Sequence, residues 1–231
     1  GAQAFQQVLS KSRLVSRPSV QGPVEVVGQR LARVAAHPDY QWRFAVIDDP
    51  KQRNAFCLPG GRVAVYTGIL PIAQTTTGLA VVLGHEIAHA IARHGAERMS
   101  QGLAAQAGGT LLGGLLGGGP GANAILAAYG LGAQIGVLLP FSRTQESEAD
   151  HIGLLLMARA GYDPRGARAF WQRMERAGSG GGPPAYLSTH PSHGTREQQI
   201  DEWLPEALRY YDTSAHVADE PLPAIASGVA Q

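Results

Sequence analysis

In this chain, the residues whose spacing most directly predicts chemistry are two histidines four positions apart, with a glutamate directly after the first. His85, Glu86 and His89 lie in residues 75–94, where apolar residues recur at helical spacing and threonines offer an N-cap. On one helix both imidazoles leave the same face, so both can reach one zinc ion at about 2.0–2.1 Å. Glu86 would project beside the metal, where a carboxylate can act as general base towards an attacking water. The pattern predicts a catalytic zinc site.

A third ligand must come from elsewhere in the chain, because a catalytic zinc site usually takes three protein ligands. Glu146 and Asp150 are four residues apart near the start of a second expected helix, residues 141–161. We expect Glu146 to bind the metal and Asp150 to accept the free N–H of a ligand histidine, which would fix the orientation of that ring. Glu148 is the rival ligand, and acids at a helix start can also simply favour the helix dipole.

The composition limits the classes of partner and the redox chemistry. The chain has 231 residues, enough for one sizeable core, and its 19 basic and 18 acidic residues give no indication of a nucleic-acid partner. Cys57 is the only cysteine, so no intramolecular disulfide can form, and we expect it in a buried strand. The first residue is Gly, which predicts a processed or engineered fragment, so any signal peptide or lipid-anchor segment would already have been removed.

The elements expected around the metal helix give an α+β fold that is mainly α. The periodicity predicts a helix over residues 20–36, and the aromatic and branched residues of 42–47 predict a strand. Residues 54–67 predict a hairpin with a Pro-Gly-Gly reversal. This small sheet would precede the metal helix and pack against it.

A long stretch without charged residues, between Arg98 and Arg143, has two interpretations. It contains a Gly-rich segment, 111–120, and an apolar segment, 122–139, that is nearly long enough to span a bilayer. One interpretation is a transmembrane or re-entrant hairpin. The other is a glycine-jointed helical pair packed on the catalytic helices, and the glycine content together with the polar residues of the second segment favours it.

These motifs together resemble the HtpX/Oma/CAAX-prenyl-protease family of zinc metallopeptidases, peptidase family M48. The resemblance rests on the H-E-x-x-H pentapeptide, the later E-x-x-A-D motif, residues 54–61, and Thr189-His190-Pro191 with Arg196. It covers roughly residues 20–205 and is greatest for the bacterial periplasmic members of the LoiP and BepA kind, which are often lipoproteins. It implies a gluzincin-type domain with one zinc ion per chain and endopeptidase activity on misfolded or unassembled envelope proteins.

Carried over position by position, the resemblance makes His85, His89 and Glu146 the zinc ligands and Glu86 the general base. It also places His190 at the active site, and two roles for this histidine stay open. It could donate to the oxyanion of the tetrahedral intermediate, or it could be a fourth zinc ligand that holds the enzyme latent. We expect the latent form in a substrate-free structure.

Two further groups of residues are expected to support the site. Arg196 lies close enough in sequence to His190 to anchor its loop on one of the two helix carboxylates through a charge-assisted bond. The hairpin strand at Phe56, Cys57 and Leu58 is either core sheet or an edge that pairs with an extended substrate through backbone bonds.

The expected organisation is an N-terminal extension over residues 1–19, the metallopeptidase domain over 20–211, and a C-terminal tail over 212–231. The expected location is the periplasm or cell envelope, with a lipid anchor as an open alternative, and the expected partners are unfolded or unassembled proteins. A chaperone-like assembly factor with a latent, closed zinc site shares every motif and is the competing interpretation. An integral membrane protease is a third.

Overall fold

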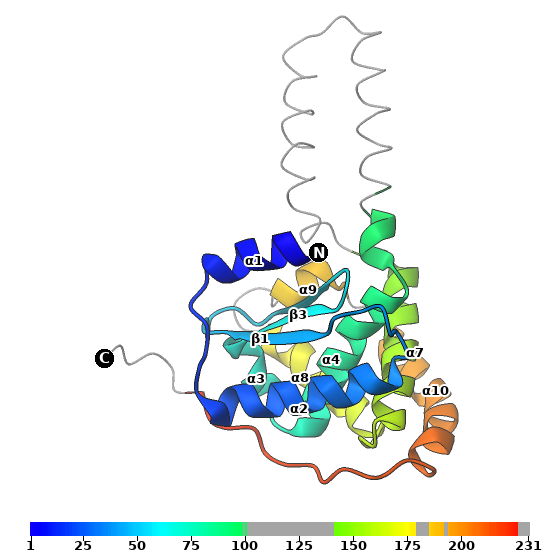
Figure 1. Ribbon diagram of the computed structural model, residues 1–231. Helices are drawn as coiled ribbons and strands as arrows, with labels where there is room; N and C mark the ends of the chain where they lie inside the picture. The colour runs from blue at the N-terminus through cyan, green and yellow to red at the C-terminus, as the bar shows by residue number, and fades with distance from the viewer. Residues whose placement is uncertain (99, 101–140, 179–184, 192–193, 226–231) are drawn as a thin grey trace, which may run out of the picture.

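The computed structural model describes residues 1–98, 100, 141–178, 185–191 and 194–225 (Figure 1). The Gly-rich stretch with two interpretations lies outside these residues. Within the described part of the chain, no helix has both the length and the apolar character needed to cross a membrane.

The described chain is mainly helical with one small sheet, which confirms the expected α+β class (Figure 1). The elements in order are α1 (Ala2–Ser10), α2 (Pro18–Val34), β1 (Arg43–Ile47), β2 (Ala55–Leu58), β3 (Arg62–Tyr66), the 3-10 turn η1 (Thr67–Ile69), α3 (Leu70–Ala73), α4 (Thr76–Ile91), α7 (Arg143–Arg159), α8 (Gly166–Gly178), α9 (Ala185–Thr189) and α10 (Arg196–Tyr211).

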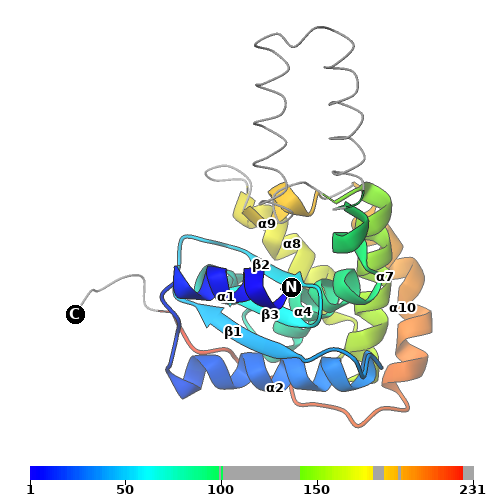
Figure 2. The same ribbon diagram turned by 45° about the horizontal axis from the view of Figure 1, so that its top comes forward.

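The sheet has the strand order β1-β3-β2, and α1 and α2 lie on different sides of it (Figure 2). Strands β2 and β3 form the predicted antiparallel hairpin, and β1 pairs parallel with β3. Gly60 and Gly61 make the reversal with φ of 89° and 83°, which glycine adopts without steric cost. Helix α1, which the sequence pattern did not reveal, packs Phe5 on the sheet face that carries Phe56 and Ala64. The opposite face packs on α2 and α4.

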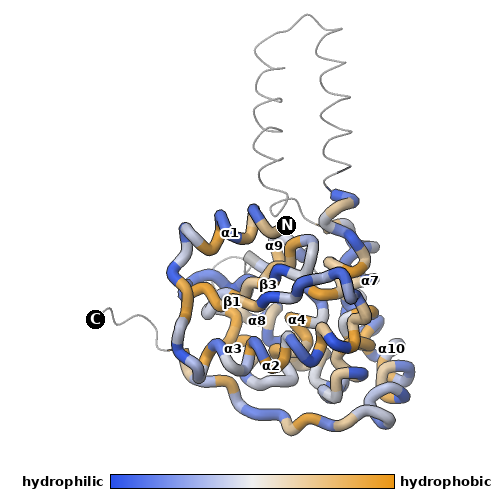
Figure 3. Tube along the Cα trace, in the orientation of Figure 1, coloured by the Kyte–Doolittle hydropathy of each residue, from blue (hydrophilic) through white to orange (hydrophobic). Residues whose placement is uncertain are grey.

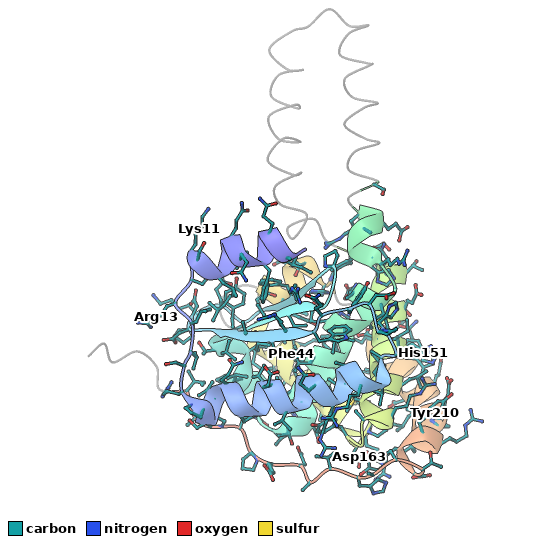
Figure 4. The ribbon with its side chains drawn as sticks, in the orientation of Figure 1. Lys11, Arg13, Phe44, His151, Asp163 and Tyr210 are labelled. Atoms are coloured by element: carbon teal, nitrogen blue, oxygen red, sulfur yellow. The ribbon has the colours of Figure 1, made fainter. Side chains whose placement is uncertain are left out.

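Helix α2 confirms the predicted helix over residues 20–36, with its bounds shifted by two residues at each end. Its hydrophobic and hydrophilic residues alternate along its length, as expected for a helix with one buried face (Figure 3). Phe44 of β1 lies between the strand and this helix (Figure 4). A Cβ at Gly28 would lie 2.4 Å from the Phe44 ring, so this glycine lets the helix approach the sheet closely.

Helix α4 is the central element, and nearly all of its residues are buried. Thr75 caps it by accepting a bond from the backbone N–H of Gly78. The expectation that the helix continues to residue 94 is wrong at its C-terminal end. The helix ends at Ile91 because the chain turns at Arg93, whose φ is 59°. Because of that turn, the side chain of His94 contacts the side chain of His89.

The C-terminal segment after α10 returns across the molecule to the start of α4. The backbone N–H of Thr76 donates to the carbonyl of Glu220, and the N–H of Thr77 donates to Oδ1 of Asp219 at 2.8 Å. A segment far away in sequence therefore satisfies N–H groups that a helix start leaves without intrahelical partners.

We expect Asp219→Ala to lower the free energy of unfolding by about 1 kcal/mol, as the loss of a helix N-terminal acceptor typically does. Asp219→Asn should lose less, because the amide oxygen still accepts the bond. Denaturant unfolding measures both, with Glu220→Ala as the matched control, since Glu220 contacts α4 through its backbone oxygen and Thr76 Oγ1 through its backbone N–H. Equal stability of Asp219→Ala and Glu220→Ala would contradict this role.

Candidate metal centre

Four buried side chains from three separate parts of the chain meet at one point. His85 and His89 come from α4, Glu146 comes from the first turn of α7, and His190 follows α9. One donor atom from each lies within 4.8 Å of the others, and each residue is at most 3% exposed. The structure thus brings together the three residues predicted as ligands and the histidine predicted as the fourth.

The spacing of these donor atoms fits a tetrahedral metal. Nε2 of His85 lies 3.0 Å from Nε2 of His89 and 3.2 Å from Nδ1 of His190. A carboxylate oxygen of Glu146 lies 2.9 Å from the His190 nitrogen and 3.2 Å from the His89 nitrogen. Four ligands placed at about 2.0–2.1 Å on a tetrahedron are roughly 3.3 Å apart. Three imidazole nitrogens and one carboxylate at this spacing suit a zinc ion.

The close crossing of α4 and α7 brings these ligands together. Gly84 of α4 and Gly153 of α7 face each other, and a Cβ at Gly153 would lie 2.9 Å from the backbone nitrogen of His85. A larger residue at either position would push the helices apart and move Glu146 away from the histidines. This contact was not predicted, since two glycines inside helical patterns do not show that they face each other.

Arg196 links the two carboxylates of α7 from the start of α10. Its Nη2 donates to Glu146 at 2.9 Å and its Nε donates to Asp150 at 2.6 Å. The other oxygen of Asp150 lies 2.9 Å from Nδ1 of His85, as predicted for a carboxylate that orients a ligand ring. Arg196 is only 2% exposed, and its guanidinium also lies over the Trp171 ring.

The charges of the site are strongly coupled. Burial alone would raise the pKa of Glu146, but His85 and the other two histidines hold it well below its usual range. Burial would lower the pKa of His85, but Glu146 and Asp150 outweigh it and raise that pKa to about 10. Burial likewise opposes the charge of Arg196, and the two carboxylates raise its pKa. The ionised form of Glu146, which can donate to a metal, is therefore the one that the site favours.

Glu86 lies beside the donor group rather than within it. The residue is 2% exposed, and its Oε1 lies 3.4 Å from Nε2 of His190. Tyr186 stacks on His190 with ring centroids 4.4 Å apart, and Phe141 stacks on His89 at 3.8 Å. Neither aromatic was predicted as a site residue, and their only sequence signal is their place next to predicted site segments.

The rival ligand Glu148 and the helix-end histidine His94 also lie near the centre. Glu148 points away from the four-residue group and contacts Nε2 of His94 at 3.2 Å. Two other histidines lie away from it: His151 pairs with Glu206, and His216 stacks on Tyr211.

The hairpin strand β2 lies at the edge of the sheet within the described residues. The side chain of Phe56 packs on the α1 face, together with Leu58. Cys57 is partly buried and, with His89 and Phe141, lines a pocket of about 300 Å³. Burial, reinforced by the charge of Glu86, raises the pKa of the Cys57 thiol well above its usual value. Of the three residues predicted to bind substrate, only Cys57 lines this pocket beside His89.

Comparison with known proteins agrees with the geometry. The model of peptidase family M48 matches residues 18–204. The chain is 42% identical over 201 residues to the mitochondrial metalloendopeptidase OMA1 of Schizosaccharomyces pombe, covering 83% of this chain and 55% of that protein. It is 39% identical over 178 residues to the human OMA1, covering 73% and 33%.

A bacterial relative is also similar. The putative beta-barrel assembly-enhancing protease of Vibrio cholerae is 31% identical over 197 residues, covering 81% of this chain and 40% of that protein. The chain spans about half or less of the length of these relatives. The match to the family model over most of its length confirms the predicted resemblance, and the chain therefore belongs to peptidase family M48.

Proposed function

We propose that this chain is the catalytic domain of a zinc-dependent metalloendopeptidase that cleaves misfolded or unassembled proteins of a cell envelope. The observation that carries the proposal is the buried group of three histidines and one glutamate, with Glu86 beside it, in a chain of peptidase family M48. His85, His89 and Glu146 would hold the zinc ion. The envelope substrates and a periplasmic or membrane-associated location are supported by the bacterial relative whose name describes beta-barrel assembly.

Each residue of the site would have a separate role in peptide hydrolysis. Zinc, when bound, supplies a Lewis acid that polarises the scissile carbonyl and makes water more acidic. Glu86 takes the proton of the attacking water and passes it to the leaving amine. Asp150 and Arg196 hold His85 and Glu146 in place. The edge of the sheet at β2 would hold an extended substrate by strand addition, with Cys57 lining the pocket next to His89.

The competing function is a chaperone-like binding factor with a closed metal site. The presence of His190 among the four donor residues favours it, because a fourth protein ligand leaves no position for water. Incubation of the chain with an unfolded protein such as casein separates the two functions. A protease cleaves casein, loses that activity with a chelator and regains it with zinc. Binding of casein without cleavage in any of these states would contradict the proposed peptidase.

The contacts of His190 would allow one metal site to be closed without substrate and catalytic with it. Its Nδ1 faces the donor group and its Nε2 faces Glu86, while stacking on Tyr186 holds the ring. We propose that it occupies the fourth position until substrate displaces it.

We expect His190→Ala to retain zinc and to raise the turnover of a short peptide, because three protein ligands remain and the fourth position opens. Metal content and peptide cleavage measured side by side test this. A fall in turnover with full zinc content would instead assign His190 to the oxyanion of the transition state, where loss of one donor costs about 2.7–4 kcal/mol. His216→Ala is the control, since His216 lies on the surface away from the site.

A further inference from the structure

The ring of His89 is held from behind by a second histidine. Nδ1 of His94 lies 2.9 Å from Nδ1 of His89, and Nε2 of His94 lies 3.2 Å from Oε2 of Glu148. His94 is 2% exposed, whereas the Glu148 side chain is 54% exposed. On a continuous helix two residues five apart would lie about 140° apart around the axis, so they would not meet. The turn at Arg93 makes this contact available.

His89, His94 and Glu148 form a row of three side chains in contact. The positions of the protons on the two histidines follow from Glu148, the acceptor at the end of this row. An ionised carboxylate only accepts hydrogen bonds, so Glu148 requires the proton of a neutral His94 to be on Nε2. Nδ1 of His94 is then an acceptor, and His89 must donate to it from its own Nδ1. A neutral His89 with its proton on Nδ1 keeps a free lone pair on Nε2, the nitrogen that faces the donor group.

The opposite arrangement would prevent metal binding by His89. If His94 carried its proton on Nδ1, it would donate to Nδ1 of His89, and the proton of His89 would occupy Nε2. For a neutral His94, the carboxylate of Glu148 disfavours this arrangement, because it would face an imidazole nitrogen that has no proton to donate.

We propose that His94 and Glu148 are positioning residues that select the metal-binding tautomer of His89. The inference rests on the proposed zinc site and deepens it. The two ligand histidines are then supported differently. His85 is backed by Asp150, which is buried and paired with Arg196, whereas His89 is backed by a second imidazole that reaches a carboxylate at the surface. Zinc affinity therefore depends on a surface residue that touches no ligand.

The test measures the zinc dissociation constant of the metal-free chain by competition with a chromogenic chelator, so it needs no peptidase activity. His94→Leu and His94→Asn form a matched pair, because the two new side chains have nearly the same size and only the amide can accept from His89. We expect His94→Leu to raise the dissociation constant roughly 10–100-fold, the usual effect of losing a group that orients a metal ligand. His94→Asn should keep most of the affinity.

Glu148→Ala provides a second variant that leaves the core intact. It should weaken zinc binding less than His94→Leu, since His94 then chooses between its two tautomers rather than losing its contact with His89. Glu202→Ala, at an exposed glutamate of α10, is the control and should bind zinc like the wild type. In the His94→Leu background, Glu148→Ala should have no further effect, because the two residues act in series.

Three results would overturn the inference. Equal affinities of His94→Leu and His94→Asn would mean that His94 only fills space. A Glu148→Ala affinity equal to that of Glu202→Ala would remove the carboxylate from the row. A wild-type chain that binds no zinc would remove this inference and the proposed function together, whereas unchanged variants of a zinc-binding wild type remove this inference alone.

Discussion

Replacing Glu86 by glutamine is expected to abolish peptide cleavage while leaving the metal in place. The amide has the size of the carboxylate but cannot take a proton from water, and proton transfer by a positioned side chain contributes about 10²–10⁴-fold to a rate. Glu86 is not one of the four donor residues, so zinc content should remain at one ion per chain. Because the residue is buried, the neutral amide also introduces no new charge into the core.

The measurement combines cleavage of an unfolded protein with metal analysis of the same sample. Glu202→Gln, the same change at an exposed position of α10, should cleave like the wild type. Cleavage by Glu86→Gln at the wild-type rate would show that another group takes the proton. Loss of zinc together with activity would instead assign Glu86 to the metal.

Replacing Arg196 by methionine is expected to have the largest effect on stability. The change leaves Glu146 and Asp150 buried without their cation, and breaking a buried ion pair by removing one partner typically costs about 3–5 kcal/mol. Arg196→Lys should recover only part of the loss, since one ammonium group cannot reproduce two bonds made by separate guanidinium nitrogens. Bound zinc should reduce the loss, because it neutralises Glu146.

Denaturant unfolding with and without zinc checks this expectation. Arg209→Met is the matched control, because Arg209 is exposed near the end of the same helix. A free energy of unfolding for Arg196→Met equal to that of the control would mean that the two carboxylates do not depend on Arg196.

The parts of the site that follow from local patterns could be predicted from the sequence. Helical spacing alone placed His85 and His89 on one face, and the spacing of Glu146 and Asp150 placed both carboxylates on one helix. Alternation and the Pro-Gly-Gly reversal predicted the hairpin. His190 was expected at the site from the family resemblance, since no local pattern connects it to residues a hundred positions away.

The features that sequence reasoning missed depend on contacts between distant segments. Helix α1 is fixed by Phe5 against the sheet, and the segment after α10 is fixed by its bonds to the start of α4. The early end of α4 depends on a left-handed conformation at Arg93, which has no glycine to signal it. Propensity and periodicity carry no information on such contacts. They show which face of a segment is buried, but they do not identify the segment that buries it.

The position of Arg196 after α4 and α7 in the sequence has a consequence for biosynthesis. A ribosome or export channel releases the metal helix and both carboxylates of α7 before it releases Arg196 and α10. Until α10 docks, Glu146 and Asp150 lack the guanidinium that pairs with both of them, so their burial against α4 costs more free energy than it does in the folded chain. The buried charge network of the candidate metal centre is therefore completed only when α10 docks. A nascent chain, or one clipped before residue 196, contains the whole H-E-x-x-H motif but lacks the guanidinium that pairs with Glu146 and Asp150.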